Sequence, residues 1–291
     1  MLKRLFRPTN RRVRWLVGIL LVGLSFVLYT RQTVAVKPAD AFVTVMDGAA
    51  LGEMSSDTVA TLEDLARTDH IALLEMCLEN ARQYNDYTLT FIKQERLRGK
   101  LRDQQTIEAA FRRQPFSVAM KWIENAPKGD RLLYVEGMWN GQMLIRPTGW
   151  AAQLAMGGRT LRDTTGKEVM ESTLRPVTMF GFENSLKNLL EVYRTAKARG
   201  DLVEEFGGFA KIDDRPVLVL VRRLPAAADY PSAKTVIYID MEYLVPVMVE
   251  GYDWTTPQPE FMCRYIFKNI RFNVGLPDDR FTPQANDMNS P

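Results

Sequence analysis

The sequence predicts a mainly β protein, of class α+β, in which an antiparallel sheet of about ten or eleven short strands wraps around amphipathic helices. One membrane-spanning helix is expected before this domain. Three observations support the prediction. The first 31 residues combine seven Lys or Arg with no Asp or Glu and an uncharged apolar run at 15–30. Beyond them, two segments have apolar residues at helical spacing, and about ten alternate with a period of two between turn residues.

The apolar run at 15–30 follows a basic segment at 1–14, which is the pattern of an export signal. The run ends in Tyr29-Thr30-Arg31-Gln32, and the nearest small-x-small cleavage pattern is Ala39-Asp40-Ala41. We therefore expect an uncleaved signal-anchor, with cleavage near Ala41 as the alternative. The basic flank favours a single-pass protein of a bacterial inner membrane, with a cytoplasmic N-terminus, a linker at 31–56 and a periplasmic domain.

The positive charge of the chain resides in this N-terminal segment. The formal net charge is +3, but beyond residue 31 there are 31 basic and 35 acidic residues. The domain is thus mildly acidic, and the basic isoelectric point is no sign of nucleic-acid binding. We expect no nucleic-acid partner.

Two amphipathic helices are predicted outside the membrane. Between Leu62 and Tyr84 the apolar residues share one stripe, with Asp69 as an N-cap. A second stripe runs along 184–199, and Gly200 follows it as a C-terminal glycine should. Both helices need an apolar surface, which a sheet with one apolar face supplies.

Ten segments alternate as strands do, and neighbours in sequence are joined by turn residues such as Asn140-Gly141 and Asp213-Asp214. They are 87–92, 105–112, 117–124, 131–137, 142–146, 206–212, 217–223, 235–240, 244–252 and 261–272. The stretch 150–178 is a long excursion, with a short strand expected near Thr160, of the kind that often forms a lid. One domain at 57–283 results, and the polar tail at 284–291 is predicted to be disordered.

The sequence contains few residues suited to catalysis or metal binding. Its one histidine, His70, is expected to be a surface or capping residue at a helix start. One His and two Cys are too few for a two-histidine metal site or for structural zinc. Phosphate-binding loops, dinucleotide fingerprints and nucleophile elbows are absent from the sequence. We expect no metal, no cofactor and no catalytic residue.

The two cysteines leave two alternatives open. Cys77 lies on the apolar stripe of the first helix and Cys263 lies in the final strand. An oxidising compartment favours a disulfide between them. Free cysteine is also among the residue types most often buried as a small apolar group, and we expect this second alternative.

Four carboxylates on predicted strands lie beside basic residues: Glu95, Glu108, Glu136 and Asp253. Cross-strand ion pairs account for that pattern. Glu136 and Asp253 differ in having aromatic neighbours, where burial would raise a carboxyl pKa. The candidate ligand-binding residues gather around these two acids: they are Tyr134, Glu136, Met138, Trp139, Met143, Tyr252, Asp253 and Trp254. The fourteen Met residues would suit an adaptable apolar lining, although core packing explains them as well.

Four stretches resemble the domain-of-unknown-function 1571 family of bacterial envelope proteins: Leu133–Gly137, Pro115–Val118, Gly251–Trp254 and Tyr265–Leu276. The resemblance covers roughly 72–281, and the last stretch is also similar to the closing strand of the lipoprotein carrier LolA and its relatives. This likeness implies an unclosed antiparallel β-barrel with helices in its mouth around a hydrophobic cavity, which in the carrier takes the acyl chains of lipoproteins. The carrier has a cleaved signal, whereas this chain looks tethered, and the close family has no assigned activity.

The sequence is compatible with three functional hypotheses. The leading expectation is a membrane-anchored, non-enzymatic periplasmic protein that binds a lipid, acyl chain or lipoprotein in its cavity. The second is a structural or interaction module of an envelope complex, which uses its sheet edge or long loop to hold a protein partner. The third is an envelope hydrolase that uses Glu136 or Asp253.

Overall fold

The computed structural model describes residues 43–46, 55–155, 158–227, 229–255 and 257–288. The chain divides into two compact units, Met1–Val43 and Thr44–Pro291. The predicted membrane anchor at 15–30 and most of the predicted linker at 31–56 lie outside the described residues. Among the helices that the structure does describe, none has the length and apolar character needed to cross a membrane.

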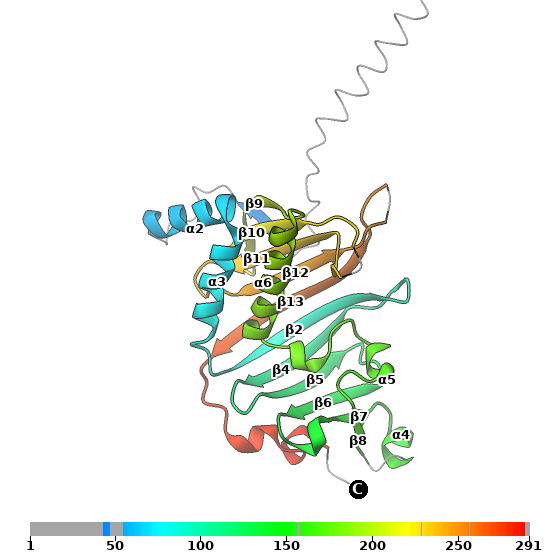
Figure 1. The fold of residues 1–291 in the computed structure, drawn as a ribbon. Helices are drawn as coiled ribbons and strands as arrows, with labels where there is room; N and C mark the ends of the chain where they lie inside the picture. Colours follow the sequence, from blue (N-terminus) through cyan, green and yellow to red (C-terminus); the bar gives the residue numbers. More distant parts are fainter. Residues whose placement is uncertain (1–42, 47–54, 156–157, 228, 256, 289–291) are drawn as a thin grey trace, which may run out of the picture. The chain divides into compact units, whose positions relative to one another are not determined.

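The described part of the chain is built on one large sheet of thirteen strands (Figure 1). They are β1 (Val43–Met46), β2 (Asp86–Leu97), β3 (Lys100–Leu101), β4 (Gln105–Arg112), β5 (Ser117–Glu124), β6 (Gly129–Val135), β7 (Met143–Pro147), β8 (Thr160–Arg162), β9 (Val203–Ile212), β10 (Arg215–Arg223), β11 (Lys234–Asp240), β12 (Pro246–Tyr252) and β13 (Phe261–Phe272). The expected number was ten or eleven. The two unforeseen strands, β1 and β3, have four and two residues and are too short for alternation to be visible.

The strand order is β1-β9-β10-β11-β12-β13-β2-β4-β5-β6-β7-β8, with β3 paired to β2 outside this path. The pairs from β9 to β8 are antiparallel, as the hairpin turns predict. In the Asp213-Asp214 turn both residues have positive φ, 49° and 63°, which the short Asp side chain tolerates. The two ends of the order, β1 and β8, are not neighbours in it, so the described sheet is open.

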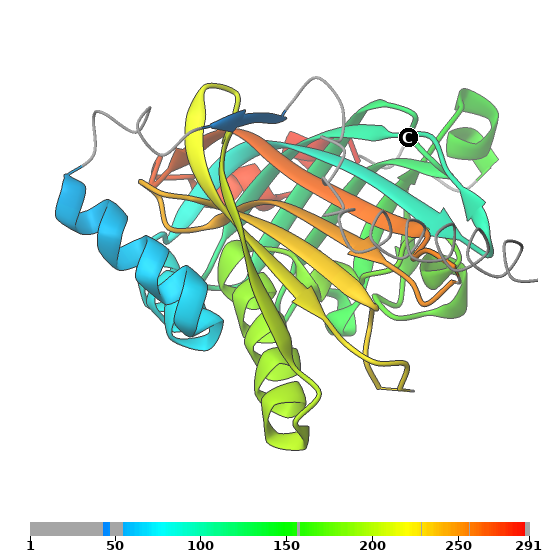
Figure 2. The ribbon, with the colours of Figure 1, turned by 90° about the horizontal axis from the view of Figure 1, so that it is seen from above.

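Three longer helices accompany the sheet: α2 (Ser56–Thr68), α3 (His70–Ala81) and α6 (Phe182–Arg199). The Asp69 carboxylate caps α3, as predicted, because it accepts hydrogen bonds from the backbone N–H groups of Ile71 and Ala72 at 3.1 Å. Helix α6 ends at Gly200 with φ 73°, also as predicted. Helices α3 and α6 pack together on one face of the sheet, here called the inner face (Figure 2).

The excursion between β7 and α6 lies over the β4–β7 half of the inner face (Figure 1). It contains α4 (Trp150–Ala155), the expected short strand β8, α5 (Lys167–Met170) and the 3₁₀ turn Val177–Met179. It ends at Gly181, whose φ is 103° and where a Cβ would lie 2.7 Å from the Phe111 ring. The next backbone N–H, that of Phe182, donates to the Tyr87 hydroxyl at 3.1 Å. Glycine at 181 therefore lets the start of α6 approach β2 closely.

The end of the chain differs from the prediction of a disordered tail at 284–291. Met288 is fully buried in an apolar cluster with Phe281 and Leu133. The Asn286 amide donates to the carbonyl oxygens of Arg280 and Thr282 at 3.0 and 2.8 Å. The prediction rested on the polar composition of this segment. In the structure, two short 3₁₀ turns, Asp278–Phe281 and Gln284–Asn286, precede Met288, which packs against the sheet. Residues 289–291 lie outside the described part.

Candidate functional site: a cavity on the inner face

A cavity of about 930 Å³ lies between the inner face of the sheet, the excursion and α6. This volume is within the range of about 300–1,000 Å³ that is usual for small-molecule sites. Its wall is mainly apolar and combines distant parts of the chain. Representative side chains are Phe91 of β2, Met120 of β5, Leu132 of β6, Phe180 of the excursion, Leu189 of α6 and Phe267 of β13.

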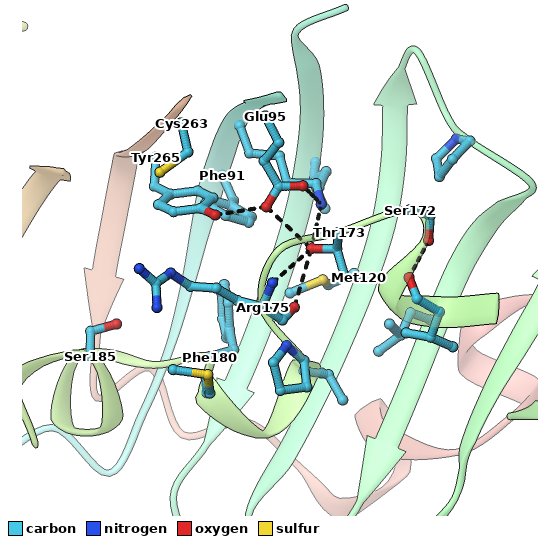
Figure 3. Close-up of a pocket in the computed structure, with 18 of the residues that line it drawn as sticks. Phe91, Glu95, Met120, Ser172, Thr173, Arg175, Phe180, Ser185, Cys263 and Tyr265 are labelled. Atoms are coloured by element: carbon cyan, nitrogen blue, oxygen red, sulfur yellow. Dashed lines mark hydrogen bonds and ion pairs between the residues drawn. The ribbon is translucent and has the colours of Figure 1, made fainter. Parts of the chain in front are cut away.

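Glu95 holds the excursion against the sheet (Figure 3). Its carboxylate is only 3% exposed and accepts hydrogen bonds from the Tyr265 hydroxyl at 2.7 Å and the Leu174 backbone N–H at 3.2 Å. The Thr173 hydroxyl donates to the same oxygen at 3.2 Å, and the Lys93 ammonium is 3.2 Å from the other oxygen. Burial raises the pKa of Tyr265 well above its ordinary value, so its hydroxyl stays a donor. One buried acid thus joins β2, β13 and the excursion.

Arg222 of β10 is a second buried charge in the wall. Its Nη2 donates to the Thr235 hydroxyl at 2.7 Å and lies 3.4 Å from the Ser232 hydroxyl. Its guanidinium carbon is 5.1 Å from the centre of the Tyr193 ring of α6. Burial lowers the pKa of Arg222, and the positive charge of Arg175 in the excursion lowers it further.

Glu250 of β12 is a third buried charge in the wall, and it has a counter-ion. The Arg264 Nε donates to its carboxylate at 2.7 Å, and the Tyr252 hydroxyl lies 3.3 Å from the other carboxylate oxygen. Burial, followed by the charge of Glu250, raises the pKa of Tyr252. The buried charges that line the cavity among the described residues therefore lie on β2, β10 and β12.

Of the eight candidate residues from the sequence, Met143 lines the cavity. Tyr134 instead packs against Phe116, with ring centres 5.7 Å apart, and Trp139 packs on the apolar cluster around Phe281. Met138 is 49% exposed. Tyr134, Met138 and Trp139 lie at or near the β6–β7 turn and are not among the residues that line the cavity.

The other four candidates are engaged in local structure. Glu136 is exposed, and its carboxylate lies 3.4 Å from the Phe116 backbone nitrogen. Trp254 donates its indole N–H to the Leu224 carbonyl oxygen at 3.1 Å. The Tyr252 hydroxyl lies 3.3 Å from a Glu250 carboxylate oxygen. The Asp253 carboxylate accepts hydrogen bonds from the backbone N–H groups of Thr255 and Glu260. Tyr252, Asp253 and Trp254 lie together at the C-terminal end of β12, and they are not among the residues that line the cavity. Ligand binding by these residues stays a prediction.

The pKa expected for Asp253 is wrong in direction. Burial acts to raise it, but the hydroxyl and backbone N–H of Thr255 and the backbone N–H of Glu260 stabilise the carboxylate. The pKa is held below its ordinary value, because the hydrogen bonds to the charged form together outweigh the desolvation. An ionised turn-capping acid is poorly suited to act as a general acid.

His70 is buried, at 1% exposure, and is not the surface residue that the sequence suggested. Its Nε2 bonds the Ala66 carbonyl oxygen at 2.8 Å and its Nδ1 lies 3.3 Å from the Tyr193 hydroxyl. Burial lowers the pKa of His70 to about 4, so the ring is neutral at physiological pH. Within the described residues, no group of three or more His, Cys, Asp or Glu side chains is placed to hold a metal ion.

Cys77 and Cys263 are free and buried. Cys263 lines the cavity beside Tyr265, and burial raises its pKa to about 11. Burial raises the pKa of Cys77 in the same direction. Both side chains act as small apolar groups rather than as nucleophiles.

Sequence reasoning overlooked Lys93 and Arg222 and passed over Glu95 as a cross-strand ion pair. The period-two alternation of the strands nevertheless indicated that these three charged residues face inward. Lys93 and Glu95 follow Phe91 on the same face of β2, and Arg222 follows Leu218 and Leu220 in the same way on β10. A charge at an inward position of an apolar strand is informative, because burial of an ion must be compensated.

The described residues thus form an open antiparallel β-sheet domain with a mainly apolar cavity between the sheet, the excursion and α6. The chain belongs to the family described as protein of unknown function (DUF1571), whose model matches residues 84–289. The sequence has no significant match among curated proteins.

Several solved structures are similar to the chain at low identity. The Pseudomonas aeruginosa MucA/MucB complex matches at 14% identity and a TM-score of 0.45, over 75% of this chain and 62% of that chain. The lipoprotein LppX of Mycobacterium tuberculosis matches at 12% identity and a TM-score of 0.43, over 71% and 96%. A LolA superfamily protein of Nitrosomonas europaea matches at 10% identity and a TM-score of 0.32, over 73% and 98%.

Proposed function

We propose that this protein is a non-enzymatic envelope protein that holds the apolar part of a lipid, an acyl chain or a lipoprotein in the cavity on its inner face. The observation that carries the proposal is the cavity of about 930 Å³ with its mainly apolar wall. Apolar surface that leaves water is stabilised by about 25 cal/mol per Å². A hydrocarbon chain suits such a site because burial of its apolar surface is almost its whole source of binding free energy.

The excursion serves as the movable wall of this cavity. It contributes residues from α4 to Phe180 to the lining, and Glu95 bonds it through Thr173 and Leu174. An exposed ion pair between Arg98 and Glu171 adds a contact close by. Entry of a ligand requires these few polar contacts to open, while the sheet keeps its pairing.

The basic and apolar segments at 1–14 and 15–30 support a place for the domain on the outer side of a bacterial inner membrane. With an uncleaved anchor, the protein receives or holds a hydrophobic ligand at the membrane. A free shuttle would need the segment to be cleaved.

Binding is tested with the full-length chain. Organic extraction of the purified protein, followed by mass spectrometry, identifies a co-purified lipid, and titration with the neutral dye N-phenyl-1-naphthylamine reports an open apolar site. Ser185→Trp adds an indole to the lining of the cavity from α6 and should weaken dye binding by about tenfold or more. Ala198→Trp places the same side chain on an exposed position of the same helix and should leave binding unchanged.

Two results would oppose the proposal. One is an unmodified chain that yields no lipid and takes up no dye. The other is an equal dye affinity of the Ser185→Trp and Ala198→Trp variants, which would place the dye elsewhere.

A second candidate function, a protein-interaction module, is favoured by exposed apolar side chains at one end of the sheet. Trp150 and Leu154 of α4 are 79% and 68% exposed, and Leu161 lies on the terminal strand β8. Exposed apolar groups and an open strand edge suit a protein partner. A photo-cross-linking residue at 150 should then capture one dominant protein in cells, and the same residue at 198 should not.

A further inference from the structure

Arg222 occupies an inward position on β10. The strand alternates, so Leu218, Leu220 and Arg222 share the inner face, while Arg223 points to the other face. Arg223 is exposed and bonds Glu205 at 2.8 Å. Arg222 is only 2% exposed and belongs to the lining of the cavity. The two adjacent arginines therefore have opposite environments.

The guanidinium of Arg222 has donors without acceptors. Its Nη2 uses the hydroxyls of Thr235 and Ser232, but Nε and Nη1 are buried and have no hydrogen-bond partner in the described structure. Guanidinium groups accept no hydrogen bonds and do not lose their proton, so these N–H groups need an oxygen. Orphaned buried donors are rare in folded proteins and call for an explanation.

Arg222 also lacks a counter-ion among the described residues. Glu204 lies opposite it in the register of β9 and β10, but the Glu204 carboxylate accepts the His70 backbone N–H at 3.2 Å and forms no ion pair with Arg222. The other buried charges of the wall differ: Lys93 has Glu95 at 3.2 Å. A buried charge is ordinarily paired.

A second guanidinium adds positive charge to the same region. Besides burial, the positive charge of Arg175 lowers the pKa of Arg222, while Tyr193 acts in the opposite direction. Arg175 extends beside Tyr265, with its guanidinium carbon 5.8 Å from the ring centre (Figure 3). It forms no ion pair within the described residues. The two arginines would repel each other less with an anion between them.

We infer that Arg222, together with Arg175, binds the anionic head group of an amphiphile whose hydrocarbon chain lies along the apolar wall. This inference rests on the proposed function and specifies its ligand class: an acyl or alkyl chain that ends in a carboxylate or a phosphate. The planar fork of Arg222 suits two oxygens of such a group, and the Ser232 and Thr235 hydroxyls supply further polar contacts. Because Arg222 borders the cavity, a turn of its side chain brings the Nε–Nη2 edge or the Nη1–Nη2 edge of the guanidinium to an entering oxyanion, so that one of the two orphaned donors is satisfied.

The test compares four amphiphiles of equal chain length on the full-length chain. Hexadecanoate, hexadecyl phosphate, hexadecanol and hexadecyltrimethylammonium are used to displace N-phenyl-1-naphthylamine. At least one anion should bind about tenfold or more tightly than hexadecanol, and the cation should bind most weakly. The better of the two anions identifies the head group, and inorganic phosphate, which lacks the chain, should displace no dye.

Variants separate a head-group site from a structural role. Arg222→Met should reduce the preference for the anion over hexadecanol to within about twofold, Arg222→Lys should retain part of it, and Arg175→Met should lower it in part. Arg223→Met, at the neighbouring exposed position, should keep the full preference. Thermal unfolding of each variant shows that the comparison is made on folded protein.

The outcomes are distinguishable. Dye binding without any preference for anions in the unmodified chain overturns the head-group site and leaves the proposed function intact. An anion preference that survives both Arg222→Met and Arg175→Met also overturns it. Failure of the dye and of all four amphiphiles to bind overturns the proposed function and the head-group site together.

Discussion

The Tyr265 hydroxyl donates a 2.7 Å hydrogen bond to the Glu95 carboxylate, and this contact links β13 to β2 inside the cavity wall. The same carboxylate accepts hydrogen bonds from Thr173 and Leu174 of the excursion. It also neutralises the buried ammonium of Lys93. One acid thus contacts two strands of the wall and the excursion at the same time.

Replacement of Glu95 by Ala should lower the free energy of unfolding by about 3–5 kcal/mol, because Lys93 is left buried and unpaired. The excursion should open as well. Urea denaturation measures the first effect, and hydrogen exchange of residues 172–176 measures the second.

Glu108→Ala is the matched control for Glu95→Ala. Glu108 lies on the adjacent strand β4, is exposed and pairs with Lys121 at 3.3 Å across to β5, as the sequence predicted for such acids. Its loss should cost about 1 kcal/mol or less. Equal urea midpoints for the two variants would show that Glu95 has no special role in the wall.

Stability should fall as the pH is lowered from about 7 to 4 because of His70. Burial lowers the pKa of His70 from 6.5 to about 4 in the folded protein. Between these values the unfolded chain binds a proton that the folded chain does not, so the contribution is present above pH 6.5 and is lost as the pH falls towards 4. The loss amounts to about 3 kcal/mol. Urea unfolding at pH 7, 6, 5 and 4 measures it.

His70→Gln isolates this effect, since its amide can still donate to the Ala66 carbonyl oxygen. Glu204, which accepts the His70 backbone N–H, has a pKa raised by burial, and its own contribution to stability has the opposite dependence on pH. The difference between the unmodified protein and His70→Gln should therefore carry the His70 contribution. A difference that does not change between pH 7 and 4 would mean that the folded His70 has an ordinary pKa.

Cys77 and Cys263 should react with Ellman's reagent only after unfolding. Both are buried and free, and burial raises the pKa of each thiol, so the reactive thiolate is scarce and shielded. The native protein should release little dye, and the unfolded, unreduced protein should show two thiols per chain. An unfolded protein without thiols would establish the disulfide instead.

The sheet was largely predictable because its strands carry local information. The segments 105–112, 117–124 and 261–272 have the predicted bounds, since each alternates over at least eight residues and is closed by turn residues. The N-cap at Asp69 and the terminal Gly200 are also local signals. Strands such as β3, with two residues, carry too little pattern.

The cavity was less predictable because it depends on which distant segments meet. Aromatic residues near an acid directed attention to Glu136 and Asp253, which lie at exposed or turn positions where water or backbone N–H groups satisfy them. Glu95 and Arg222 lie between apolar neighbours in alternating strands. Their inward direction was readable, but their partners on β13, α6 and the excursion follow only from the tertiary structure.

Replacement of Met288 tests whether the end of the chain is packed against the sheet, where its polar composition predicts disorder. Its side chain is fully buried in the cluster with Phe281 and Leu133 at the sheet. Met288→Ala should therefore lower the free energy of unfolding by about 2–5 kcal/mol, through lost apolar contact and the cavity left behind. Met138→Ala makes the same chemical change at a half-exposed position in the β6–β7 turn and should cost about 0.5 kcal/mol or less. If both variants unfold at the same urea concentration, the Met288 side chain is not packed in the cluster with Phe281 and Leu133.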